Sequence, residues 1–133
     1  MHSRIQRRFF DASVLGLGHL LGRTDSRIIF PGHPDWPFGP SADDDVWLAH
    51  VGDLNWTAFM RDKKVRTRPG ERAALIGHRV RAINITVSKN RSPEEYAELL
   101  AEHAQAIDEV EAQEPAYFHL TQSGLTRHIQ YPR

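Results

Sequence analysis

The sequence contains no cysteine. That absence excludes a disulfide framework, a zinc–thiolate site and a thiol nucleophile. The eight histidines show no HxH or HExxH spacing either, so no zinc site is indicated. Long hydrophobic runs are also missing, because Asp11 interrupts the apolar stretch at Phe9 and Phe10 and no other segment approaches the length that spans a membrane. We therefore expect a soluble, cytoplasmic protein with no membrane partner.

An excess of charge of one sign is lacking too, since 17 Lys and Arg residues balance 17 Asp and Glu residues. The two signs are nevertheless segregated. Residues 61–81 carry eight of the basic side chains, whereas residues 94–114 carry eight of the acidic ones and neither Lys nor Arg. This polarity favours a phosphate backbone as the partner of the basic segment, and it is also compatible with two oppositely charged solvated faces.

Strand-like and helix-like segments alternate along the chain. Short apolar runs predict strands at 9–10, 27–30, 56–60 and 80–85. Apolar residues at helical spacing predict helices at about 14–21, 42–51 and 69–76, and one long helix at 93–110. A hairpin is expected at about 116–131. The long helix begins with a capping box, Ser92-Pro93-Glu94-Glu95. The alternation predicts a single α/β domain over residues 1–133, in three layers around a mainly parallel sheet.

Acidic residues recur where these predicted strands end. Asp11 follows the first strand, Asp62 follows the third, and Asp43 to Asp45 open the helix after the second. Because ligand sites of parallel α/β sheets lie outside the carboxyl ends of the strands, these acids are expected at the functional edge. Carboxylate oxygens there suit a hard divalent cation such as Mg²⁺ or Mn²⁺. A cap or turn role remains the alternative for each acid taken alone.

Three motifs carry a resemblance to a known family. The first is an apolar strand that ends in Asp-x-Ser, Phe9-Phe10-Asp11-Ala12-Ser13. The second is an acidic helix start, Asp44-Asp45-Val46-Trp47, which is followed by Gly52. The third is an apolar strand that ends in Arg-Asp, Trp56 to Asp62, which is followed by a basic run and by Pro69-Gly70-Glu71. In order and spacing these segments resemble the PIN-like nucleases, and in particular the compact VapC-type toxins, from residue 9 to about residue 110. Met60 departs from the pattern, because the family often has Thr at this point.

The resemblance implies a PIN-like, Rossmann-like fold and a metal-dependent endoribonuclease that acts as the toxin of a toxin–antitoxin pair. Its catalytic, metal-binding acids would be Asp11, Asp44 and Asp62. The cofactor would be Mg²⁺ or Mn²⁺, the substrate RNA, and the partner an antitoxin protein that blocks the site. The proline-rich loop leaves the alignment of the three consecutive aspartates open by one position, so Asp45 is a further candidate ligand.

Neighbouring side chains have expected supporting roles. The metal would lower the pKa of a bound water and orient it for in-line attack on a phosphodiester. Flanking phosphates would be held by the basic residues Lys63, Lys64, Arg66 and Arg68. Ser13 is expected to hydrogen-bond Asp11 or the bound water, or to cap the helix, and Glu71 is either a fourth acid or a cap. The sequence leaves open which RNA is cut and whether the chain forms a homo-oligomer.

Two other functions fit parts of the pattern. A receiver-like phosphotransfer domain also places acids after its first and third strands and a hydroxyl, here Thr86 or Ser88, after the fourth. The chain lacks the adjacent acid pair near the first strand and a clear later strand-end lysine that such a domain would have. A non-catalytic binding module would use the basic segment to hold RNA or protein, with the acids as helix caps. Incubation with a small phosphodonor and a metal titration separate these alternatives from a nuclease.

Overall fold

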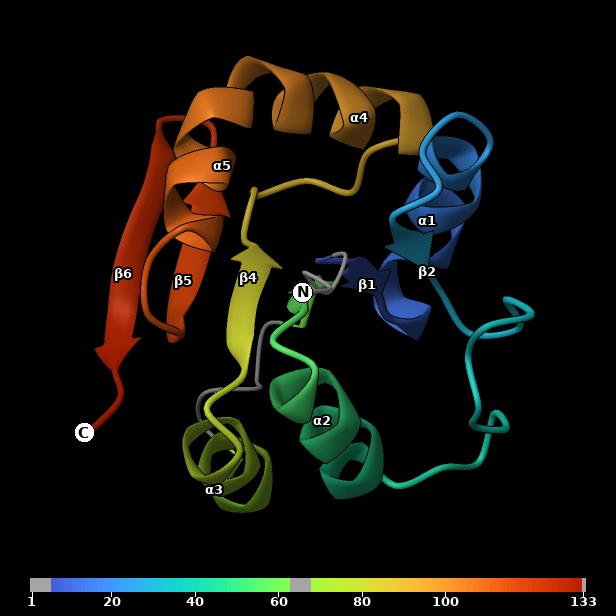
Figure 1. The fold of residues 1–133 in the computed structure, drawn as a ribbon. Coiled ribbons are helices and arrows are strands. Elements are labelled where there is room, and N and C mark those ends of the chain that lie inside the picture. Colours follow the sequence, from blue (N-terminus) through green and yellow to red (C-terminus); the bar gives the residue numbers. More distant parts are fainter. Residues whose placement is uncertain (1–5, 63–67, 133) are drawn as a thin grey trace, which may run out of the picture.

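A six-stranded sheet forms the centre of the protein in the computed structural model, which describes residues 6–62 and 68–132 (Figure 1). The strands are β1 (Arg8–Phe10), β2 (Ile28–Ile29), β3 (Thr57–Met60), β4 (Arg81–Ile85), β5 (Ala116–Thr121) and β6 (Gly124–Gln130). Their order is β2-β1-β3-β4-β5-β6, and every neighbouring pair is parallel except the antiparallel hairpin of β5 and β6. The predicted α/β class, with a mainly parallel sheet and a C-terminal hairpin, is confirmed.

Helices cover both faces of the sheet. They are η1 (Ala12–Val14), α1 (Leu15–Gly22), α2 (Asp44–Asp53), α3 (Pro69–Gly77), α4 (Pro93–Glu102) and α5 (Ala104–Glu111). In Figure 1, α1, α4 and α5 lie on one side of the sheet and α2 and α3 on the other. Phe9 packs in one buried cluster with Leu48 of α2 and Leu75 of α3. Phe10 packs in the other cluster with Leu99 of α4, because successive strand residues point to opposite faces.

The prediction of a single long helix from residue 93 to about residue 110 is wrong. The chain instead forms α4 and α5, separated at His103, whose backbone (φ −110°, ψ 20°) leaves the helical region. The Nε2 atom of His103 lies 3.1 Å from the carbonyl oxygen of Gln122 in the turn between β5 and β6. Buried apolar residues continue on both sides of the break, with Leu99 in α4 and Ile107 in α5. The break thus coincides with a contact to the hairpin, which the apolar pattern does not reveal.

Other elements differ from expectation at their ends. β2 is shorter than the predicted strand and comprises Ile28–Ile29. α2 begins at Asp44, two residues later than predicted, with Asp43 as its N-cap. Near the end of α2, Gly52 allows a close approach to the segment before β4, because a Cβ at this position would collide with the carbonyl oxygen of His78. This approach fixes α2 against the end of α3.

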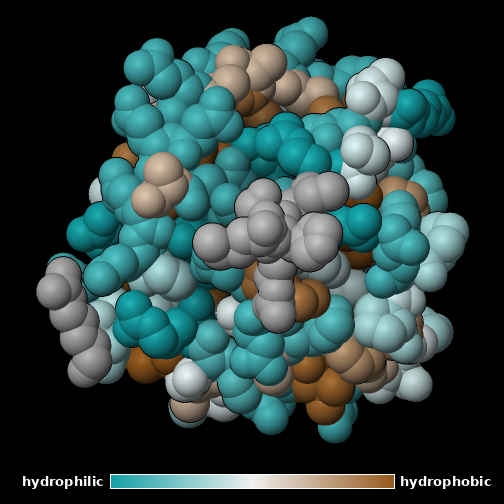
Figure 2. All heavy atoms as spheres, viewed as in Figure 1, coloured by the Kyte–Doolittle hydropathy of each residue, from teal (hydrophilic) through white to brown (hydrophobic). Residues whose placement is uncertain are grey.

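The surface shown in Figure 2 is mostly hydrophilic, and apolar residues appear on it as small separate patches. Among the described residues, the exposed large hydrophobic side chain is that of Val46, at 46%. None of the helices in the described ranges is long and apolar enough to cross a membrane. The apolar side chains of the described residues are thus mostly enclosed in the two buried clusters.

Candidate functional site

The strand order reverses between β1 and β3. In the chain β1 is followed by β2 on one side, whereas β3 lies on the other side of β1. In an open α/β sheet, ligands bind in the crevice outside the carboxyl ends of the strands at such a switch point. Asp11 directly follows β1, and Asp62 lies two residues beyond the end of β3. The two aspartates therefore flank the switch point.

Ser13 fixes the Asp11 carboxylate. Asp11 is the N-cap of η1, and its Oδ1 accepts a hydrogen bond from the Ser13 backbone N–H at 2.9 Å and another from the Ser13 hydroxyl. The hydroxyl oxygen in turn accepts from the backbone N–H of Arg61 at 2.9 Å. Since Arg61 directly precedes Asp62, the Ser13 hydroxyl connects the end of β1 to the end of β3.

Burial raises the pKa of the Asp11 carboxyl to about 6. The hydrogen bonds from Ser13 lower this pKa, and the negative charges of Asp62 and Asp44 raise it. Both desolvation and neighbouring like charges disfavour the ionised form of a carboxyl group. The influence of Asp44 and Asp62 on Asp11 means that the three carboxylates share one electrostatic environment, which a cation would stabilise.

Asn84 of β4 holds the main chain of Asp62. Its Oδ1 accepts from the Asp62 N–H at 3.0 Å, and its Nδ2 donates to the Asp62 carbonyl oxygen at 2.5 Å and to the Tyr117 hydroxyl at 2.8 Å. The side chain is 2% exposed, so these bonds satisfy an amide that water does not reach. Sequence reasoning missed this residue, although a polar amide between Ile83 and Ile85 in an apolar strand is a detectable signal.

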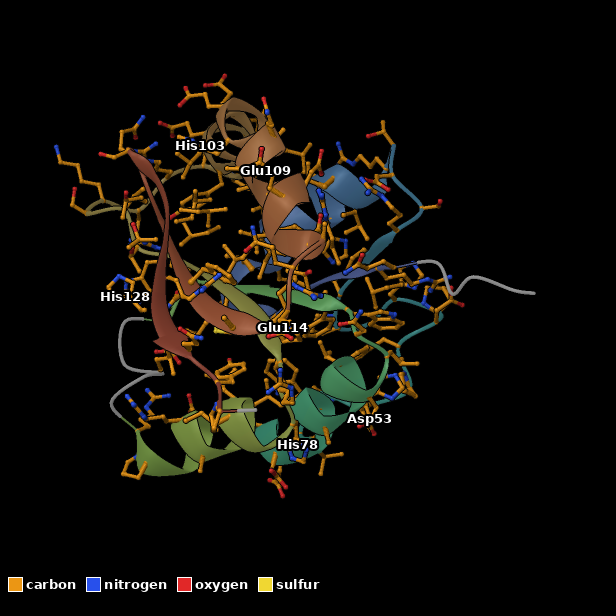
Figure 3. All side chains as sticks on the ribbon, turned by 60° about the vertical axis from the view of Figure 1, so that its left-hand side comes forward. Asp53, His78, His103, Glu109, Glu114 and His128 are labelled. Carbon is orange, nitrogen blue, oxygen red and sulfur yellow. The ribbon has the colours of Figure 1, made fainter. Side chains whose placement is uncertain are left out.

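The consecutive aspartates at the start of α2 have different surroundings. Asp44 accepts a 2.9 Å hydrogen bond from the indole Nε1–H of Trp47 and lines the same pocket as Asp11. The Oδ1 atom of Asp45 lies 3.0 Å from Nε2 of His78, which follows α3 beside α2 (Figure 3). The Asp45 side chain is 74% exposed. The structure therefore brings Asp44 to Asp11 and directs Asp45 to His78.

Arg68 lies among the carboxylates. Its Nη1 is 3.2 Å from Oδ2 of Asp62 and 2.8 Å from Oε1 of Glu71, which is in the first turn of α3. The hydrogen bond to Glu71, and then the negative charges of Asp62, Glu71 and Asp44, raise the pKa of Arg68 above its ordinary value. Arg68 thus connects Glu71 to Asp62. We refer to Asp11, Asp44 and Asp62 together as the acidic edge. The other residues expected to bind phosphate, Lys63, Lys64 and Arg66, lie outside the described residues.

A pocket of ≈ 510 Å³ lies beside these acids. Asp11 and Asp44 line it together with aromatic residues of β1, the proline-rich loop and α2, which are Phe9, Trp36, Phe38 and Trp47. Another pocket, of ≈ 440 Å³, lies at the amino end of β5 and is lined by Gln113, Glu114 and Arg127 among others. The first pocket shares residues with the acidic edge and combines apolar walls with converging polar groups, so it is the candidate ligand site.

Within residues 6–62 and 68–132, no group of three or more His, Cys, Asp or Glu side chains is arranged to hold a metal ion. The chemistry of the donors nevertheless fits a divalent cation, because Asp11, Asp44 and Asp62 offer the carboxylate oxygens that Mg²⁺ and Mn²⁺ prefer. The acidic neighbours of Asp11 raise its pKa, and a bound cation would offset that accumulation of charge. Joint coordination requires the three carboxylates to approach one another more closely.

Comparison with known proteins agrees with this geometry. Residues 8–87, more than half of the chain, match a family described as PIN like domain. The matched segment runs from β1 to just beyond β4 and contains Asp11, Asp44, Asp62 and Asn84. No curated protein and no solved structure gives a significant match.

Proposed function

The chain belongs to the PIN-like domain family, whose members are generally nucleases, and we propose that it is a metal-dependent endoribonuclease acting as the toxin of a toxin–antitoxin pair. The observation that carries this proposal is the placement of Asp11 and Asp44 in one pocket at the switch point, which Asp62 flanks at the end of the neighbouring strand. Such a group suits a cation that acts on a phosphodiester. The family match gives no support to the receiver-like alternative.

In this proposal Asp11, Asp44 and Asp62 hold Mg²⁺ or Mn²⁺. When bound, the metal supplies an activated water and offsets the charge that develops on the phosphate. The chain's own residues position the ligands. Ser13 donates to Asp11, and Asn84 fixes the main chain of Asp62 at both its N–H and its carbonyl oxygen. The carboxylates are thus presented from strand ends that hydrogen bonds hold in place.

Arg68 supports a cation-binding role for the acidic edge, because its guanidinium already contacts Asp62 and Glu71. The Arg68 side chain is 51% exposed, so these ion pairs are readily exchanged for other partners. We propose that Arg68 then binds an RNA phosphate, together with the basic residues that precede it in the chain. RNA binding should therefore weaken as the salt concentration rises, and the salt dependence should be smaller in Arg68→Gln.

An antitoxin would block the acidic edge in the cytoplasm. A partner's Arg or Lys could contact Asp62 as the Arg68 guanidinium does, at about the same distance. Purification from the native host should recover a small partner protein. Expression of the chain without that partner should arrest growth, and Asp11→Asn should relieve the arrest. A chain that is recovered alone and is harmless when expressed would contradict the toxin role.

Cleavage of a mixed RNA pool tests the enzymatic role directly. The wild-type protein should cut RNA with Mg²⁺ or Mn²⁺ and not in EDTA, and Asp11→Asn should be slower by at least about a hundredfold, because an amide keeps the shape and removes the charge of the ligand. Asp53→Asn is the matched control, since Asp53 is an exposed aspartate at the opposite end of α2 from Asp44. Undiminished cleavage by Asp11→Asn, or full activity in EDTA, would contradict the proposal.

Thermal melts test metal binding separately from catalysis. Without metal, Asp62→Asn should be at least as stable as the wild type, because one of several mutually repelling charges is removed. Mn²⁺ should raise the Tm of the wild type by binding the folded state, and should raise that of Asp62→Asn much less. Equal responses of the two proteins to Mn²⁺ would rule out Asp62 as an important ligand.

A further inference from the structure

Aromatic side chains form much of the pocket beside the acidic edge, and metal and phosphate binding do not account for them. The Trp36 ring stacks on Phe9 with centroids 4.0 Å apart, and Phe38 meets Trp36 edge-on at 5.2 Å. Phe38 and Trp47 are partly buried, so part of their apolar surface remains open to solvent. Apolar surface that is left in contact with water favours a ligand that covers it.

The aromatic wall and the acids are directly connected. Asp11 and Asp44 line the same pocket as the aromatic rings. Trp47 donates its indole N–H to Asp44 at 2.9 Å, so the indole lies against the carboxylate. A ligand group held at the carboxylates therefore has its covalent neighbour within reach of the aromatic rings.

We infer that this pocket receives a nucleobase of single-stranded RNA, adjacent to the phosphodiester at the acidic edge, an inference that rests on the proposed ribonuclease function. Every base has a flat face that stacks on aromatic side chains. A base that is paired and stacked in a duplex is not free to enter a pocket, so the base that binds here must be unpaired. The volume of ≈ 510 Å³ lies in the ordinary range for sites of small ligands.

Neutral nucleosides test the pocket independently of metal and of catalysis. Adenosine, guanosine, cytidine and uridine are each titrated into isotope-labelled protein, with ribose as the probe that lacks a base. The indole N–H signals of Trp36 and Trp47 should shift in a saturable way with at least one nucleoside and should not shift with ribose. The signal of Trp56, a buried tryptophan that is not among the lining residues, should not move.

A pair of variants assigns the binding to the pocket. Phe38→Leu should weaken nucleoside binding by at least about fivefold, the lower end for loss of one base-stacking ring. Phe30→Leu is the matched control, because Phe30 is also a partly buried phenylalanine and is not among the lining residues. Equal weakening by the two variants would overturn the inference, as would equal indole shifts with ribose.

The outcome separates the pocket from the ribonuclease. Nucleoside binding without any RNA cleavage would support the base pocket and contradict the enzymatic role. RNA cleavage without indole shifts from any nucleoside would leave the enzymatic role intact and overturn the base pocket. If a co-purified protein shifts the indole signals and no nucleoside does, the pocket belongs to a protein partner and the inference is wrong.

Discussion

Helices α4 and α2 begin in different ways. At α4, the Ser92 hydroxyl accepts a 3.2 Å hydrogen bond from the Glu95 N–H, and Glu95 accepts a 3.0 Å bond from the Ser92 N–H. This capping box satisfies the helix start with its own neighbours in the chain. At α2, an aspartate also stands at the N-cap, yet the Asp43 side chain makes no capping bond.

Of the two acids that follow at α2, Asp44 is bonded within its own helix and beside the pocket, whereas Asp45 contacts a residue of another segment. Asp44 contacts Trp47 and the pocket, and Asp45 contacts His78 beyond α3. Their charges still interact favourably with the helix dipole. Asp44 lines the pocket at the switch point, which is why we propose that it binds a ligand there. In this proposal, the acidic start of α4 caps its own helix and the acidic start of α2 contributes to a site.

The largest effect expected from this difference is on cleavage. Asp44→Asn should slow RNA cleavage by at least about a hundredfold, because it removes one charged ligand, and should leave the Tm of the metal-free protein nearly unchanged. Asp43→Asn, one residue earlier, is the control and should cleave like the wild type. Similar cleavage by both variants would remove the distinction between Asp43 and Asp44 at the start of α2.

The pH dependence of stability should reveal the same site. The pKa of Asp11 is about 6 in the folded protein and near 3.8 in the unfolded chain, so folding favours the protonated form. The contribution of Asp11 to stability is therefore full below about pH 4 and is lost as the pH rises through about 6. In EDTA, the free energy of unfolding of the wild type relative to Asp11→Asn should fall on the order of 3 kcal/mol over that range. Urea denaturation at several pH values measures this, and parallel curves for the two proteins would contradict it.

A substitution at the start of α4 should have the opposite outcome to Asp44→Asn, because it should lower stability and leave RNA cleavage unchanged. Ser92→Ala removes the acceptor for the Glu95 N–H and should cost about 1 kcal/mol of stability. For a domain of this size that lowers Tm by roughly 4 °C. The rate of RNA cleavage at a temperature well below Tm should stay unchanged. A loss of cleavage without a loss of stability would place a function at α4 and break the comparison.

The smallest effect is expected for Asp45→Asn. The contact between Asp45 and His78 is exposed to solvent, so its loss should change stability by no more than about 0.5 kcal/mol. Cleavage should remain as in the wild type. If Asp45→Asn loses cleavage as severely as Asp44→Asn, both aspartates take part in metal binding, and the measured rates then decide which of them contributes more.

Most of the fold follows from local patterns. The strands that carry Asp11 and Asp62 are short apolar runs that end abruptly, as buried parallel strands do. The start of α4 was predictable because Ser92 and Glu95 satisfy each other within a few residues. The break at His103 was not predictable, because buried residues continue through α4 and α5 and the contact with Gln122 joins segments 19 residues apart.

The sequence by itself determined that Asp11 and Asp62 stand at the same edge, because each acid follows an apolar strand and parallel strands end together. It left open which of the aspartates of α2 faces Asp11, since neighbouring helix residues point about 100° apart. Only the tertiary structure decided this, by bringing His78 to one side of α2 and the pocket to the other. The tertiary structure alone also revealed the role of Asn84, because its hydrogen bonds to Asp62 cross between strands and exist only once the sheet has formed.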